Sequence, residues 1–168
     1  MKFFRLGRKP RLGAVLALCL AVLGGVSLAD ARLWIARFSA SDIEGWLPYA
    51  YSGKTAYSLA ESGDGIALKA ESDAAASAYY RDQYVDLSKT PVLHWRWRVD
   101  HGPSGLQEQT RAGDDYAARV YVVHKRGLLR KPYIINYVWS GSQARGSEWA
   151  NAWLPKHSAM LAVRGAQD

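Results

Sequence analysis

Cysteine is nearly absent from this chain, whose 168 residues include only Cys19. A disulfide within the chain needs two cysteines, so the sequence excludes a disulfide-stabilised fold. Cys19 also lies in an N-terminal segment that we expect to be removed, which leaves neither a thiolate metal ligand nor a thiol nucleophile. The fold must therefore depend on its core, to which seven Trp and ten Tyr can contribute large apolar surfaces.

The motifs of several enzyme classes are also missing. The sequence contains no His-Glu-x-x-His, no His-x-His pair, no Gly-x-Ser-x-Gly turn and no phosphate-binding glycine loop. Carboxylates two residues apart on a clear strand, the arrangement of sandwich-fold glycosidases, do not occur either. The four histidines are scattered along the chain. These absences favour a protein that is not an enzyme.

Residues 1–31 have the order of a secretory signal peptide. A basic lead from Lys2 to Arg11 precedes an apolar run over residues 12–23 and a small-residue exit that ends in Ala-x-Ala. The run is shorter than the roughly 20 residues that span a bilayer, so we expect cleavage near Asp30 or Arg32 rather than a retained membrane anchor. The sequence therefore predicts a periplasmic or secreted protein with one domain over residues 32–168.

The positive charge is concentrated in that segment. The formal net charge is +7, and removing the segment's five basic residues and one acidic residue leaves +3. No dense basic stripe follows, so nucleic acid is not an expected partner.

Short strands separated by turns are expected along residues 32–168. They cover residues 33–39, 57–59, 66–70, 78–81, 92–99, 117–124, 133–140 and 158–164. The step from Asp64 to Gly65 predicts a hairpin, and the capping-box spacing of Ser41 and Glu44 predicts one helical turn before Trp46. The pattern indicates an all-β sandwich or barrel.

Two neighbouring strands carry polar side chains that could form a ligand face. On residues 92–99, Trp95 and Trp97 alternate with basic residues, so we expect the Trp side chains in the core. If this strand pairs with residues 117–124, their polar side chains would form a cationic surface that grips carboxylates or sulfates. A merely solvated sheet face is the alternative. The candidate ligand-binding residues are His94, Arg96, Arg98, Arg119 and Tyr121.

Asp114 and Asp115 precede the strand at residues 117–124. Carboxylates there could bind calcium, which takes oxygen ligands. Adjacent side chains on an extended chain point to opposite sides. A structural ion pair of Asp115 with a neighbouring arginine is therefore an equal alternative to a calcium site.

Residues 125–131 and the pair Trp149 and Trp153 each have two possible roles. The connection at residues 125–131 surrounds Leu128 and Leu129 with basic residues, so it could touch an anionic surface or could protect a sheet edge. Trp149 and Trp153 could line a carbohydrate groove or could close the core.

Several of these segments together resemble a known family. Residues 93–97 (Leu-His-Trp-Arg-Trp), 114–122 and 136–139 (Asn-Tyr-Val-Trp) make the chain similar to the bacterial exported domain-of-unknown-function family 3047, DUF3047. The resemblance implies an antiparallel, jelly-roll-like β-sandwich similar to carbohydrate-binding modules. It brings no established activity or catalytic residue. It also implies a further C-terminal segment, so this chain is either truncated or completes its sheet differently.

The sequence thus predicts an exported, non-catalytic β-sandwich that binds an acidic glycan or another envelope polymer, with calcium as a candidate cofactor. A polysaccharide lyase or hydrolase on the same scaffold is the first alternative. A structural envelope protein without a small ligand is the second.

Overall fold

The computed structural model describes residues 32–40, 42–63 and 65–168. The chain forms two compact units, Met1–Leu93 and His94–Asp168, which we call unit 1 and unit 2 and describe separately. The proposed signal peptide lies outside the described residues, as do Ser41 and Asp64. No helix in the described ranges is long and apolar enough to cross a membrane.

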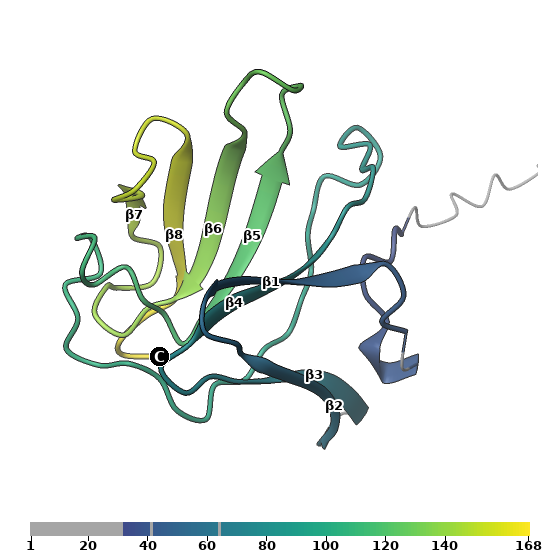
Figure 1. Cartoon of the computed structure of the whole chain (residues 1–168), viewed down its shortest axis with the longest axis horizontal. Helices are drawn as coiled ribbons and strands as arrows, with labels where there is room; N and C mark the ends of the chain where they lie inside the picture. Colours follow the sequence, from purple (N-terminus) through teal and green to yellow (C-terminus); the bar gives the residue numbers. More distant parts are fainter. Residues whose placement is uncertain (1–31, 41, 64) are drawn as a thin grey trace, which may run out of the picture. The chain divides into compact units, whose positions relative to one another are not determined.

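Unit 1 contains two small antiparallel sheets (Figure 1). After the 3-10 helix η1 (Phe38–Ala40), strand β1 (Trp46–Ser52) pairs with β4 (Ala76–Arg81), and β2 (Ala56–Ser62) pairs with β3 (Gly65–Glu71).

Aromatic rings connect the two sheets of unit 1. The ring of Tyr79 on β4 stacks on Trp46 of β1 at 5.7 Å and on Tyr57 of β2 at 5.0 Å. Phe38 of η1 contacts Trp46 at 5.5 Å. These rings supply the apolar contact that two-stranded sheets need for stability.

Unit 2 contains one four-stranded sheet in the order β5-β6-β8-β7 (Figure 1). Its strands are β5 (Ala118–His124), β6 (Tyr133–Trp139), β7 (Glu148–Ala150) and β8 (Ser158–Arg164). The pairs β5–β6 and β7–β8 are antiparallel, whereas β6 and β8 are parallel because the chain passes through β7 between them.

The register of this sheet defines two faces. Val138 of β6 lies opposite Arg119 of β5 and Ala162 of β8, so these three side chains share one face, which we call the network face. Val138, Ala162 and Met160 on this face are fully buried and form the core of unit 2. The other face, which we call the tryptophan face, carries Tyr137 and Trp139, whose rings contact Trp95 at 5.2 Å and Trp97 at 5.9 Å.

The all-β prediction is confirmed, since the part of the chain that the structure describes contains no α-helix and its sheets pair mostly antiparallel. This content is consistent with a β-sandwich. The expected strands at residues 78–81, 117–124, 133–140 and 158–164 are found as β4, β5, β6 and β8. The predicted hairpin is found as β2–β3, with Ser62 opposite Gly65.

Two local predictions are wrong. Residues 94–99 alternate as expected, with Trp95 and Trp97 half-buried, but Leu93 is exposed and residues 92–99 form no ladder with another strand. Residues 33–39 give η1 and an isolated bridge from Arg37 to Asp42 instead of a strand. The helical turn predicted before Trp46 depends on Ser41, which lies outside the described residues. In the residues that follow, the Asp42 carboxylate accepts a hydrogen bond from the Glu44 backbone amide and forms a turn.

Two strands, β1 and β7, were not predicted from the sequence. β1 contains Pro48, which has no amide hydrogen and argues against a strand. The strand tolerates it because β1 pairs on one side only. β7 has three residues, too few for an alternating pattern to stand out.

Candidate functional site

Arg119 is the centre of a polar cluster on the network face of unit 2. Its guanidinium binds the Asp114 carboxylate at 2.9 Å and donates a hydrogen bond to the Tyr121 hydroxyl at 3.1 Å. The same guanidinium lies 4.5 Å from the ring centre of Tyr116 and 5.4 Å from that of Tyr121. Arg119 is therefore held by one carboxylate and two aromatic rings, and its charge is neutralised inside the protein.

The cluster continues from Asp114 to the loop after β7. The second oxygen of the Asp114 carboxylate accepts a hydrogen bond from the Asn151 amide at 3.2 Å. The Asn151 side-chain oxygen in turn accepts hydrogen bonds from the backbone amides of Trp153 and Leu154. We call the chain of contacts from Tyr121 through Arg119, Asp114 and Asn151 the Arg119 network. It fixes the loop that carries Trp153 to the strand that carries Tyr121.

A second buried contact holds the loop before β5. The Glu108 carboxylate is buried and accepts hydrogen bonds from the Ser140 hydroxyl and the Gly141 backbone amide. The Glu108 carbonyl accepts a hydrogen bond from the Tyr116 hydroxyl at 3.0 Å. Burial raises the pKa of this hydroxyl well above its usual range, and the negative charge of Asp114 raises it further. Tyr116 is therefore a neutral structural donor rather than a proton-transfer group.

Gly113 allows this loop to close beside Asp114. A Cβ atom at Gly113 would lie 2.4 Å from the Gln107 carbonyl oxygen, so only glycine fits the approach. The sequence offered no clear signal for Glu108 or Asn151 as site residues, because each contributes through a contact more than 30 positions away in the sequence. Tyr116 was also missed, although its contacts with Glu108 and Arg119 are local.

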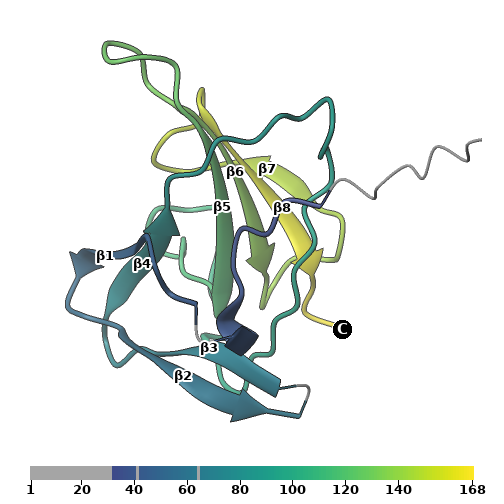
Figure 2. The ribbon, with the colours of Figure 1, turned by 90° about the vertical axis from the view of Figure 1, so that its right-hand side faces the viewer.

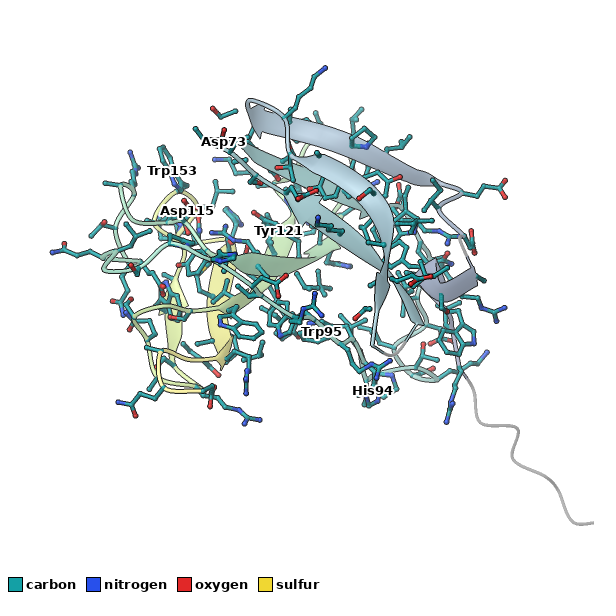
Figure 3. All side chains as sticks on the ribbon, turned by 90° about the horizontal axis from the view of Figure 1, so that it is seen from below. Asp73, His94, Trp95, Asp115, Tyr121 and Trp153 are labelled. Atoms are coloured by element: carbon teal, nitrogen blue, oxygen red, sulfur yellow. The ribbon has the colours of Figure 1, made fainter. Side chains whose placement is uncertain are left out.

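Two exposed aromatic rings lie at the ends of the Arg119 network. Tyr121 is 38% exposed and Trp153 is 57% exposed. The Arg111 guanidinium lies 5.1 Å from the Trp153 ring centre and donates a hydrogen bond to the Ala152 carbonyl. Figure 3 shows Tyr121 and Trp153 on one side of the unit 2 sheet and Trp95 on the other. This arrangement offers a ligand two exposed rings on anchored segments and a neighbouring positive charge.

A shallow open groove lies at the end of the sheet where β6 and β8 begin. Ala150 and Ala159 are paired in the ladder, and their small side chains leave the hollow between Tyr133 and Glu148. His157 also lines it, and the Nδ1 atom of His157 is buried without a hydrogen-bond partner. This groove is a second surface that a ligand could occupy.

The comparison with family models identifies the chain. The model of the family "Protein of unknown function (DUF3047)" matches residues 44–168. The chain belongs to the DUF3047 family. No curated protein and no solved structure shows a significant match to it.

The structure of this DUF3047 chain brings part of the predicted site together. Arg119, Tyr121 and Asp114 form the contacts of the Arg119 network. Arg98 instead pairs with Asp100 at 2.8 Å on an exposed segment.

The exposed residues His94 and Arg96 are not brought to the network either. They alternate with Trp95 and Trp97, which pack on the tryptophan face, whereas Arg119 lies on the network face. The predicted continuous patch of arginines therefore does not form, because residues 92–99 do not pair with β5.

The predicted calcium site receives no support from the geometry. Both oxygens of the Asp114 carboxylate contact protein groups, and the Asp115 carboxylate accepts a hydrogen bond from the backbone amide of Tyr116. Among the residues that the structure describes, no three acidic, histidine or cysteine side chains gather as metal ligands. Calcium binding by Asp114 and Asp115 stays a prediction.

Proposed function

We propose that this DUF3047 member is an exported, non-catalytic protein that binds a glycan or another envelope polymer on the network face of unit 2. The observation that carries the proposal is the pair of exposed rings at the ends of the Arg119 network: Tyr121, whose hydroxyl binds Arg119, and Trp153, whose backbone amide binds Asn151. We call these two rings the aromatic platform.

Aromatic rings bind sugars through the apolar C–H faces of the pyranose ring. Binding gains most when the rings are held in place beforehand, since less conformational freedom is lost on association. The Arg119 network supplies that preorganisation, because it ties Tyr121 and the Trp153 loop to one buried ion pair.

Charge beside the platform favours an acidic polymer. The Arg119 guanidinium is already neutralised by Asp114, so it acts as a positioning residue. Arg111 lies at the Trp153 ring with one hydrogen bond to a backbone carbonyl. Its other N–H groups can pair with the carboxylate or sulfate of a sugar stacked on Trp153.

The test is a titration with a panel of acidic and neutral glycans by calorimetry. Trp153→Ala is expected to weaken binding of the preferred glycan about tenfold, the order that one lost stacking ring produces. Trp34→Ala is a matched control, since Trp34 is 56% exposed and also has an arginine, Arg37, 5.1 Å from its ring centre.

A third variant shows whether the ligand binds the aromatic platform or the groove. Ala150→Leu fills the groove without touching the platform. Loss of binding in Ala150→Leu, with Trp153→Ala unaffected, would move the ligand to the groove. Unchanged affinity in all variants, or no binding to any glycan, would favour a structural envelope protein.

One contact favours the lyase alternative. The Tyr121 hydroxyl lies 3.1 Å from the Arg119 guanidinium, and a tyrosine beside an arginine can remove a proton next to a uronate carboxylate. Incubation with a uronate polymer distinguishes the two, because lyase cleavage creates a double bond that absorbs ultraviolet light and binding does not. Absorbance that rises with the parent protein and not with Tyr121→Phe would establish the lyase.

Export to the periplasm or the medium is part of the proposal and depends on the signal-peptide pattern of residues 1–31. A glycan of the cell envelope would be accessible to the protein in either compartment.

A further inference from the structure

The connection between β5 and β6 exposes two leucines completely. Leu128 is 100% exposed and Leu129 is 97% exposed, and both lie in the turn of the hairpin. Figure 2 shows this connection extending beyond the ends of the strands of its sheet. Exposed leucines in the middle of a turn are unfavourable in water unless another surface covers them.

Basic side chains flank the two leucines. Residues 125–131, which we call the leucine tip, contain four of them: Lys125, Arg126, Arg130 and Lys131. The tip contains no acidic residue. Protection of the β5 edge would explain basic residues near a strand end, but it does not explain two leucines whose side chains are almost fully exposed.

The tip stands on a well-formed hairpin. The β5–β6 ladder is continuous up to the pair of His124 and Tyr133. The Arg126 guanidinium lies 4.2 Å from the centre of the Tyr133 ring, which fixes one side of the tip to the strand. Gly127 has a φ of +86°, a conformation that glycine adopts without strain and that lets the chain turn before Leu128.

Apolar residues continue from the tip along the end of the hairpin. Val122 and Ile135 face each other across the ladder and are exposed, and Val123 and Tyr133 are exposed beside them. This order of residue types is typical of proteins at a membrane interface. There, leucines enter the acyl boundary, aromatic rings lie at headgroup depth and basic groups contact lipid phosphates.

We propose that the leucine tip docks this protein on an anionic lipid bilayer, with Leu128 and Leu129 inserted at the interface. Charge complementarity selects the partner, because four basic groups around an apolar point match a surface that is both anionic and apolar beneath its headgroups. The tip is separate from the aromatic platform, so this inference does not depend on glycan binding. Docking would hold the protein close to an envelope surface while the platform stays accessible.

The experiment places a fluorescent probe on the tip. The protein carries Cys19→Ser and Leu129→Cys, the new cysteine bears a nitrobenzoxadiazole group, and the N-terminus of the exported product is verified by mass spectrometry. Vesicles of phosphatidylglycerol and phosphatidylcholine in equal parts should raise the emission and shift it to the blue. Vesicles of phosphatidylcholine alone should give a much smaller change. The same probe at Leu87→Cys, which replaces another exposed leucine, should give no change.

Substitutions then separate the apolar and charged contributions. Leu128→Ser should weaken vesicle binding about tenfold, since it removes one inserted leucine. Arg130→Gln with Lys131→Gln should weaken it at least tenfold and reduce its salt dependence, because each basic group near an anionic surface contributes about fivefold. Lys54→Gln with Arg145→Gln is the charge-matched control and should change binding little.

Two results would overturn the proposal. One is a probe at Leu129→Cys that does not respond to anionic vesicles. The other is an equal response to soluble dextran sulfate that Leu128→Ser leaves unchanged, which would assign the tip to a soluble polyanion.

Discussion

At the scale of single residues, two arginine–aspartate pairs of unit 2 differ in burial. Arg119 and Asp114 are 16% and 8% exposed, whereas Arg98 and Asp100 are 68% and 62% exposed. An exposed pair contributes little because water solvates both partners equally well when they are apart. A pair screened from water leaves an uncompensated charge when one partner is removed.

This difference predicts the effect of two matched substitutions. Asp114→Ala should lower the free energy of unfolding by about 3 kcal/mol, since it leaves the Arg119 guanidinium without its counter-ion. Asp100→Ala should lower it by less than about 1 kcal/mol. Urea unfolding of both variants measures the two values, and equal losses would show that the Arg119 network is not a structural anchor.

Tyr116 predicts a loss of stability in alkali. Its pKa is raised in the folded protein by burial and by Asp114, so the unfolded chain releases this proton first, near pH 10. The stabilisation is present below that pH and is lost as the pH rises further. Tyr116→Phe should reduce the decline in stability above about pH 10, measured by urea unfolding across a pH series. A decline as steep as in the parent protein would contradict the assignment.

At the scale of elements, the strands differ in how much of each is buried. Among the described residues, the fully buried apolar side chains are those of Val138 on β6 and of Met160 and Ala162 on β8. The Asn136 amide also joins these two strands, donating hydrogen bonds to the Ser158 hydroxyl and the Ala159 carbonyl at 2.8 Å each. In contrast, β2 and β3 form a two-stranded sheet with no buried residue.

The rates of amide hydrogen exchange should therefore differ between these two pairs of strands. Amides of β6 and β8 should exchange most slowly, because opening them exposes the core of unit 2. Amides of β2 and β3 should exchange orders of magnitude faster, since a two-stranded sheet is marginal in water. Exchange followed by mass spectrometry of proteolytic fragments resolves the two regions. Equal protection would mean that the strands open together as one cooperative unit.

Local patterns predicted some elements and missed others for identifiable reasons. β8 was predicted to the residue, because a short apolar run bounded by polar residues is typical of a buried strand. The 92–99 segment has a clear alternation, and Trp95 and Trp97 do pack against the sheet, yet no strand pairs with it. Alternation reports which side of a segment is buried. It does not report whether another backbone is available for hydrogen bonds.

At the scale of the whole molecule, export predicts a defined product. Cleavage at the end of the signal-peptide pattern would leave the 137 residues from Arg32 to Asp168, with the net charge reduced from +7 to +3. Expression in a bacterium, followed by fractionation and mass spectrometry of the intact protein, tests this. An uncut chain in the cytoplasm would contradict both the cleavage and the proposed access to envelope glycans. Lengthening the apolar run is the complementary control, since a longer run should retain the chain in the membrane.

The sequence by itself determined the all-β class and the alternating burial of residues 95–99. It also determined that Arg119 and Tyr121 share one face of β5. These depend on side-chain alternation along one strand, which is a local property. Its single cysteine also excluded disulfides within the chain. Family membership likewise followed from contiguous segments such as residues 114–122 and 136–139.

Only the tertiary structure decided which polar residues meet. Asp114 was a candidate calcium ligand in the sequence and is an ion-pair partner of Arg119 in the fold, with Asn151 on its second oxygen. Trp149 and Trp153 were equivalent in the sequence, yet Trp149 packs on the core and Trp153 is exposed. The physical reason is the same in each case. Burial and pairing depend on which segments the fold brings together: Asn151 reaches Asp114 from 37 positions away, and even the nearby Arg119 meets Asp114 only because of how the chain turns into β5.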